Sequence, residues 1–117
     1  FRRVLFRSDS HFKYRFSKGL AIKASPGTEV CAAWEGAVIR VLERGYPYGQ
    51  AIILQHDNNG LITYYGALQE VTVEEGSKVH QGEQIGCLAG GGETDPSYLY
   101  LEIRENRKAV DPLLYLP

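Results

Sequence analysis

Residues 50–65, QAIILQHDNNGLITYY, decide the fold. Gln50 to His56 is the most apolar strand-like run of the chain. It is followed by Asp57-Asn58-Asn59-Gly60, a set of residues that tolerate the positive φ angles of tight turns. A second apolar run, Leu61 to Tyr65, follows that turn. The stretch therefore predicts a β-hairpin over residues 50–65.

Short strand-like runs separated by turn residues extend outward from this hairpin on both sides. On the N-terminal side we expect strands at 20–24, 29–33 and 37–43, divided by Ser25-Pro26-Gly27 and by Glu35-Gly36, with a loop from Gly45 to Gly49 before the hairpin. On the C-terminal side, Gly76, Gly82 and Gly86 recur in a V-x-x-G-x-x-V-x-x-G-x-x-I-G pattern, which is typical of tight corners between very short strands. This spacing favours an all-β domain.

The run YLYLEIR, residues 98–104, alternates strictly between two kinds of side chain. Its leucines and isoleucine fall on one face, and Tyr98, Tyr100, Glu102 and Arg104 fall on the other. The aliphatic face is expected to face the core. The tyrosine face must then point at solvent, a groove or a partner.

Composition sets the limits of the domain organisation. The chain has 117 residues, of which 44% are hydrophobic, which is enough for one core and too few for two domains. No apolar run approaches the ~18 residues of a membrane-spanning helix, so no membrane span is expected. No stretch has helical periodicity. We therefore predict a mainly antiparallel all-β domain, either a folded sheet or a flattened barrel of short strands, with a central groove.

The first eight residues, FRRVLFRS, resemble the translation of a common sequencing-library adapter and are expected to be non-native. The alternative is a basic amphipathic segment that contacts acidic lipid. Removing its three arginines changes the formal net charge from −1 to −4, which gives the remaining domain, residues 9–117, no electrostatic reason to bind nucleic acid. On this interpretation any natural signal peptide or anchor is missing from the sequence.

Cys31 and Cys87 are the two cysteines of the chain. Their spacing matches no metal site, and each lies in an apolar, strand-like run. Buried thiols are the expected state. A disulfide between them is the alternative if the compartment is oxidising.

Taken together, the blocks at 18–38, 48–68 and 73–86, and YLYLEIR (98–104) with AVDP (109–112), resemble the LytM (lysostaphin-type) zinc endopeptidase domain, over residues 12–116. Active members of that family carry a His-x-x-x-Asp pair, a histidine in a Tyr-x-His-Leu block and a late His-x-His. Three of these groups bind Zn²⁺ and leave one position open for water. The matching positions here are Ser17, Ala21, Ala67, Tyr98 and Tyr100.

This substitution pattern implies that the metal, and with it catalysis, has been lost. Alanine has no donor atom, and neutral serine and tyrosine oxygens are poor zinc ligands. The three remaining histidines, His11, His56 and His80, match no ligand position. Glu102 is expected to pair with a neighbouring base such as Arg104 or Lys108 rather than act as a catalytic carboxylate.

Within the family, the sequence is most similar to the EnvC-type activators of cell-wall amidases. In that subgroup the vacated groove captures the regulatory helix of a zinc-dependent N-acetylmuramoyl-L-alanine amidase and draws it off the amidase active site, for septal peptidoglycan splitting. The resemblance implies the same role here, in a periplasmic or otherwise extracytoplasmic setting. It assigns the partner-binding groove to Lys18, Tyr48, Tyr65, Tyr98, Tyr100 and Arg104.

Physical chemistry favours such a groove independently, because tyrosine and arginine are enriched at binding hot spots. A lysine and an arginine also suit a helix that carries acidic side chains or exposes its C-terminal carbonyls. For the tyrosines, an ordinary amphipathic outer strand face is the alternative.

Three rival hypotheses remain at the level of the sequence. The domain could be a structural or docking module that binds another protein or peptidoglycan itself. It could be a residual endopeptidase. The glycine-cornered pattern also occurs in biotinyl and lipoyl carrier domains, although no lysine stands at the turn those domains modify.

Overall fold

The predicted hairpin is the centre of the fold. In the computed structural model, β5 (Gln50–Gln55) and β6 (Ile62–Gln69) pair antiparallel, with Ile53 opposite Tyr64 and Leu54 opposite Thr63. The hairpin prediction is therefore confirmed, and β6 continues four residues beyond the expected end at Tyr65. The structure describes residues 13–15, 19–56, 60–90, 97–105 and 108–111.

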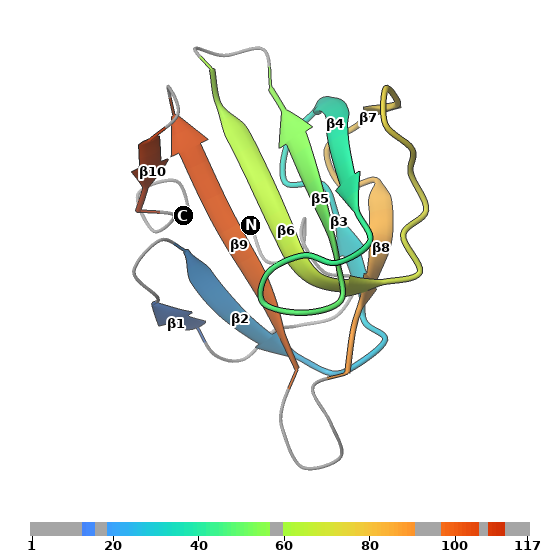
Figure 1. Ribbon diagram of the computed structural model, residues 1–117, viewed down its shortest axis with the longest axis vertical. Coiled ribbons are helices and arrows are strands. Elements are labelled where there is room, and N and C mark those ends of the chain that lie inside the picture. The colour runs from blue at the N-terminus through green and yellow to red at the C-terminus, as the bar shows by residue number, and fades with distance from the viewer. Residues whose placement is uncertain (1–12, 16–18, 57–59, 91–96, 106–107, 112–117) are drawn as a thin grey trace.

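Every regular element in these described ranges is a strand, and all pairings are antiparallel (Figure 1). Besides the hairpin, the strands are β1 (Lys13–Arg15), β2 (Leu20–Ala24), β3 (Glu29–Cys31), β4 (Gly36–Leu42), β7 (Lys78–Val79), β8 (Gln84–Leu88), β9 (Ser97–Glu105) and β10 (Lys108–Val110). The sheet runs in the order β1-β2-β9-β6-β5-β4-β7 and does not close on itself. The all-β prediction is confirmed, and the folded sheet, not the barrel, is the form observed.

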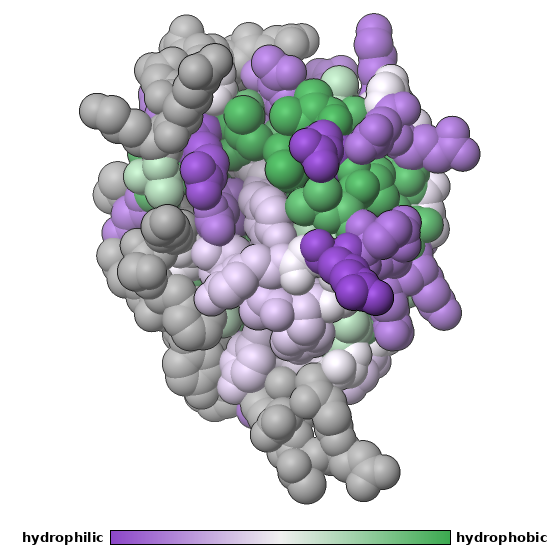
Figure 2. Space-filling model, in the orientation of Figure 1, coloured by the Kyte–Doolittle hydropathy of each residue, from purple (hydrophilic) through white to green (hydrophobic). Residues whose placement is uncertain are grey.

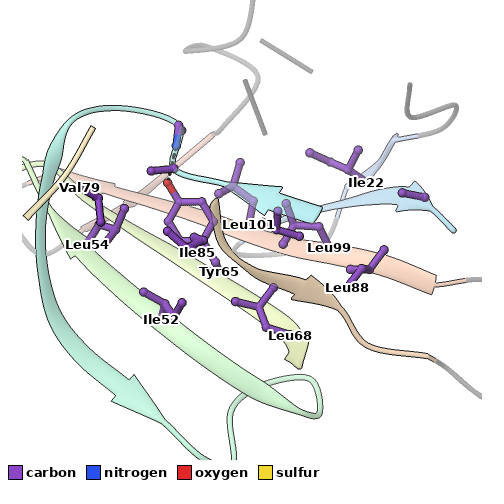
Figure 3. Close-up of a cluster of buried hydrophobic side chains, with 14 of the residues drawn as sticks. Ile22, Ile52, Leu54, Tyr65, Leu68, Val79, Ile85, Leu88, Leu99 and Leu101 are labelled. Carbon is purple, nitrogen blue, oxygen red and sulfur yellow. Dashed lines mark hydrogen bonds between the residues drawn. The ribbon is translucent and has the colours of Figure 1, made fainter. Parts of the chain in front are cut away.

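A second, smaller layer closes the core. Strands β3 and β8 pair with each other, and β8 also pairs with the end of β6. Leu88 and Ile85 from β8 therefore pack with Ile52 and Leu54 from β5 and with Leu101 from β9 (Figure 3). The apolar alternation of the short strands produces this core, because each strand directs every second side chain toward it.

Strand β9 lies at the heart of the sheet, between β2 and β6. Leu99, Leu101 and Ile103 are fully buried in the core, as the alternation of YLYLEIR predicts. The opposite face of β9 carries the tyrosines, Glu102 and Arg104. This outer face of the sheet, away from β3 and β8, is where a functional site can form.

Tyr65 does not lie in the groove, so this part of the predicted partner surface is wrong. Its side chain is 0% exposed within the core, and its hydroxyl accepts a hydrogen bond from the Ala33 backbone N–H at 2.9 Å (Figure 3). The Thr63 hydroxyl lies 3.0 Å from the Tyr65 hydroxyl, and His56 Nε2 lies 2.9 Å from Thr63. Its neighbour Tyr64 is the residue that faces outward, because successive strand residues alternate between faces.

His56 completes this buried chain of polar groups. Its Nδ1 lies 2.7 Å from the Glu35 carbonyl oxygen, which can only accept, so Nδ1 carries the proton. The ring also packs edge-on against Trp34, with centroids 5.7 Å apart. His56 therefore has a structural role, joining the hairpin to the segment that precedes β4.

Replacing Tyr65 with phenylalanine is expected to lower the free energy of unfolding by about 1–2 kcal/mol, because a buried backbone N–H loses its acceptor. Urea unfolding at neutral pH measures this change. An unchanged midpoint would mean that the Ala33 N–H finds another partner at no cost.

The same variant is expected to change the alkaline limb of the stability curve. Burial raises the pKa of Tyr65 to about 12, above its ordinary value of 10.0. A raised pKa in the folded state means that the stabilisation is complete below pH 10.0 and is lost as the pH rises through about 12. Wild-type unfolding free energy should fall over this window, and Tyr65→Phe should show a shallower fall. Equal slopes in the two proteins would contradict this account.

Cys31 and Cys87 lie on the paired strands β3 and β8, and both are buried thiols. The disulfide alternative is therefore not the state found in the structure. Burial also raises the pKa of the Cys87 thiol. A raised pKa makes this thiol less reactive.

Residues 1–8 lie outside the described part of the chain, so their non-native origin stays a prediction. No helix in the described ranges is long and apolar enough to cross a bilayer.

Candidate functional site

The site is built on one row of residues that crosses three adjacent strands. Ala21 on β2 is opposite Tyr100 on β9, and Tyr100 is opposite Gly66 on β6. Ala21 and Gly66 have little or no side chain, so the outer face of the sheet is low on both sides of the Tyr100 ring. Gly19 contributes to the same fit, because a Cβ there would come within 2.8 Å of the Tyr100 ring.

The loop between β4 and β5 covers one side of this row. Tyr64 fixes the loop to the sheet: its hydroxyl accepts from the Tyr46 N–H at 2.7 Å and donates to the Tyr46 carbonyl at 3.0 Å. Gly66 allows the close approach, since an added Cβ would overlap the Tyr46 carbonyl oxygen. The Tyr46 ring then packs edge-on against Tyr100, with centroids 4.8 Å apart.

A pocket of about 200 Å³ opens between this loop and the sheet. Its walls are aromatic and aliphatic, and its lining consists of Ala21, Tyr46, Pro47, Tyr48, Tyr98 and Tyr100. In Figure 2 the pale surface of tyrosines and neighbouring residues runs over the lower part of β6 and β9. Tyr46 is 60% exposed and Tyr48 is 36% exposed, so both rings are accessible at the pocket mouth.

The structure brings together four of the residues that the sequence placed at the site: Ala21, Tyr48, Tyr98 and Tyr100. Ala67 is not among the lining residues. It is fully buried, with φ 66, and its carbonyl accepts a hydrogen bond from the Ala89 N–H. Ser17 and Lys18 lie outside the described residues, so their predicted roles remain untested.

A chain of three polar side chains leads from the pocket along β9. The Tyr100 hydroxyl donates to Glu102 Oε2 at 2.6 Å. Arg104 donates to Glu102 Oε1 from Nε at 3.0 Å, and its Nη2 lies 2.9 Å from the same oxygen. Glu102 is 8% exposed, so a buried carboxylate is held between a phenol and a guanidinium. The predicted pairing of Glu102 with Arg104 is confirmed.

Tyr100 stays a neutral phenol in this arrangement. Burial, together with the adjacent Glu102 carboxylate that accepts a hydrogen bond from the hydroxyl, raises the pKa of Tyr100 above its ordinary value. Its hydroxyl hydrogen is already directed at Glu102. The oxygen is therefore poorly suited to bind a metal cation.

Zinc, which the fold family implies, does not fit the groups present. Ala21 offers only a methyl group at the row where the resemblance places a ligand, and Tyr100 offers a protonated phenol. Among the described residues, no group of three or more histidine, cysteine, aspartate or glutamate side chains could hold a metal ion. Glu102, the carboxylate that accepts from Tyr100, is already paired with Arg104.

Three residues of the site were missed at the sequence level: Tyr46, Pro47 and Tyr64. The loop residues carried a signal. The segment GYPYG, residues 45–49, places two tyrosines in a loop, where large aromatic side chains are more exposed than in a strand. Tyr64 carried none, because only the register of β6 places it outward and Tyr65 inward.

Arg104→Ala is expected to lower the free energy of unfolding by about 1–2 kcal/mol, because it leaves a buried carboxylate without its cation. The effect stays modest because the Arg104 side chain is 41% exposed and solvent already screens the pair. A double-mutant cycle with Glu102→Gln, followed by urea unfolding, measures the coupling. Strictly additive effects would show that the two side chains do not interact.

Comparison with known proteins agrees with this fold. The family model for peptidase family M23 matches residues 15–112. The catalytic domain of lysostaphin from Staphylococcus simulans superposes with a TM-score of 0.75 at 21% identity, covering 94% of this chain and 92% of that domain. A zinc-containing peptidase from Vibrio cholerae superposes with a TM-score of 0.66 at 26% identity, covering 90% of this chain and 34% of that one.

Curated relatives are more similar in sequence. The murein hydrolase activator EnvC of Escherichia coli is 39% identical over 100 residues, which cover 85% of this chain and 23% of EnvC. A lipoprotein NlpD/LppB homologue of Pseudomonas aeruginosa is 37% identical over 101 residues, which cover 86% of this chain and 33% of that protein. The chain thus spans a third or less of these relatives. The family match covers most of the chain and agrees with its fold, and the chain belongs to peptidase family M23.

Proposed function

We propose that this domain is a non-catalytic M23 domain that activates a cell-wall N-acetylmuramoyl-L-alanine amidase by binding the regulatory helix of that enzyme. One observation carries the proposal. The position where the resemblance places a metal centre is an aromatic pocket formed by Ala21, Tyr98 and Tyr100 together with the Tyr46–Tyr48 loop. Such a pocket suits an apolar side chain of a protein partner better than a hydrolytic metal ion.

The chemistry of the pocket supports a protein ligand. Tyrosine rings supply a large contact area at a low entropic cost, and they keep polar tips at the rim. Arg104 lies at the end of the polar chain on β9 and keeps further donors beyond those given to Glu102. It can therefore meet an acidic side chain of the same partner.

The names of the relatives favour the same class of function. EnvC and NlpD are called murein hydrolase activators, and DipM of Caulobacter vibrioides, 30% identical over 105 residues, is called a cell division protein. On the basis of these names we assign to this domain a role in septal peptidoglycan splitting and a periplasmic or otherwise extracytoplasmic location. The matched residues make up only part of each relative, so both extensions are part of the proposal.

The test is release of dye from labelled peptidoglycan by purified zinc-dependent amidases, measured with and without the domain. The domain alone is expected to release no dye, and it is expected to increase release by at least one amidase. Release by the domain alone would identify an enzyme. Failure to stimulate any amidase in a panel from bacteria that carry such domains would refute activation.

The alternative is a docking domain that binds peptidoglycan directly, with the exposed Tyr46 and Tyr48 as contact residues. Sedimentation with purified sacculi separates the two functions. Retention of the domain on sacculi without amidase stimulation favours docking, whereas stimulation without retention favours the activator.

A further inference from the structure

We infer that the partner surface extends beyond the aromatic pocket onto the outer face of β4, β5 and β6, where it takes the apolar stripe of an amphipathic helix about four turns long. This inference rests on the proposed function and specifies the partner segment. Its basis is an isoleucine patch, defined here as Ile39, Ile53 and Ile62, which neither the core nor the pocket uses.

The isoleucine patch faces away from the core. Ile39 is 38% exposed, and Ile53 and Ile62 are half-buried. The residues that alternate with the latter two, including Leu54 and Thr63, are buried on the core side. In Figure 2 a green apolar surface lies over the upper parts of β4, β5 and β6, with purple polar groups within it and around it.

Two residues of the isoleucine patch, Ile53 and Ile62, are continuous with the pocket, and Ile39 is the bulge residue of β4 next to Arg40, which lies directly opposite Ile53. Ile53 lies directly opposite Tyr64 in the hairpin, and the Tyr64 ring packs edge-on against Tyr100 with centroids 6.0 Å apart. Ile62 lies directly opposite Arg104. Directly opposed residues have side chains within contact distance. A ligand that fills the pocket and continues past Tyr64 therefore reaches the isoleucine patch.

The sheet itself determines what kind of segment can bind. β5 is paired on both sides, by β4 and β6, and β6 is paired by β5 and β9. Along β5 and β6 a partner strand therefore has no open edge to pair with. A partner that lies over these two strands is contacted through side chains, which is how a helix lies in an apolar groove.

The dimensions of the surface set the length of the helix. Across the strands, the surface extends from β9 to β4, which is three strand spacings or about 14 Å. Along the strands, it extends from Tyr98 to Arg104, which is six residues or about 20 Å. The diagonal is about 25 Å, which a helix of about 16 residues spans at 1.5 Å per residue. Charge determines which side of the helix lies over β9. Because Arg104 is on β9, we expect an acidic residue on the side of the helix that faces this strand.

Isothermal titration with a synthetic helical peptide of about 16 residues tests this inference. The peptide carries a stripe of leucines at i, i+3, i+4 and i+7 spacing and a glutamate on one flank. The wild-type domain is expected to bind it, and Ile53→Glu and Ile39→Glu are each expected to weaken binding about tenfold or more. Gln69→Glu is the control, since Gln69 is exposed on β6 but lies in the part that pairs with β8.

A peptide of half the length with the same pattern is expected to bind about tenfold more weakly. Thermal unfolding of each variant is the check that the fold is retained. If Ile53→Glu is unfolded, Ile39→Glu provides the binding comparison with the wild type. Equal binding by wild type and both glutamate variants would overturn the inference, as would equal binding of the short and long peptides.

The remaining outcomes separate this inference from the proposed function. If the wild-type domain stimulates an amidase and the glutamate variants stimulate it equally well, the helix uses the pocket alone and only the inference fails. If no amidase is stimulated, the proposed function fails even where the peptide binds. A wild-type dimer in sedimentation that Ile53→Glu dissociates would assign the isoleucine patch to a second copy of the chain and overturn the inference.

Discussion

Gly66→Ala is expected to lower the free energy of unfolding by about 2–3 kcal/mol and to disrupt the pocket, because the added methyl group would overlap the Tyr46 carbonyl oxygen. A flexible side chain could rotate away from such a clash, but here the obstacle is backbone. The loop must therefore lift from the sheet, which breaks both hydrogen bonds between Tyr46 and the Tyr64 hydroxyl.

Gly90→Ala is the matched control. Among the described residues, a Cβ at Gly90 would first meet Pro26, at 3.9 Å, which is ordinary van der Waals contact. Its effect on the free energy of unfolding is expected to stay within about 0.5 kcal/mol. Urea unfolding gives the stabilities, and amidase stimulation reports on the pocket. Wild-type stability and stimulation in Gly66→Ala would show that the loop does not lie on β6 as described.

Tyr100→Ala is expected to weaken binding of the amidase helix to the pocket about 100-fold. The Tyr100 ring forms the floor of the pocket and contacts Tyr46 and Tyr64, so its removal deprives both neighbours of their packing partner. It also removes the hydroxyl that donates to the Glu102 carboxylate.

Tyr100→Phe separates these contributions. The ring remains, so the pocket keeps its shape, while the hydrogen bond to Glu102 is lost. We expect binding to weaken by about tenfold or less. The dependence of amidase stimulation on domain concentration gives both apparent affinities, and thermal unfolding shows whether each variant is folded at the assay temperature. If Tyr100→Ala bound as tightly as wild type, the pocket would not be the partner site.

Periodicity predicted the parts of the fold where the two faces of a strand differ in chemistry. In β9, leucine and isoleucine alternate with tyrosine, glutamate and arginine, so the core face was evident and is confirmed by burial. The hairpin was equally accessible because its turn residues separate two apolar runs. In these elements local preference and tertiary packing agree.

Strand β6 shows where sequence reasoning fails. Ile62 and Tyr64 face outward while Thr63 and Tyr65 face the core, so each face carries an aromatic residue and alternation does not distinguish the two. The family resemblance selected Tyr65, whereas the register of β6 against β5 and β9 places Tyr64 at the surface. Register depends on contacts between segments distant in sequence, which a single strand does not encode.

The loop from Gly45 to Gly49 is the other part that required the structure. Its sequence identifies it as a loop, but nothing in it specifies that it folds back over β9. That position depends on a glycine at 66 and a hydroxyl at 64, both on another strand. The pocket is therefore a tertiary feature, although four of its six lining residues were singled out from sequence.

The zinc content of the purified domain after equilibrium dialysis against Zn²⁺ most directly tests whether a phenol-lined pocket now stands in place of a metal centre. We expect less than about 0.1 zinc per chain at free concentrations that saturate ordinary structural or catalytic zinc sites. One tightly held zinc per chain, released by Ala or Phe substitution at Tyr100, would contradict the assignment of this site to protein binding.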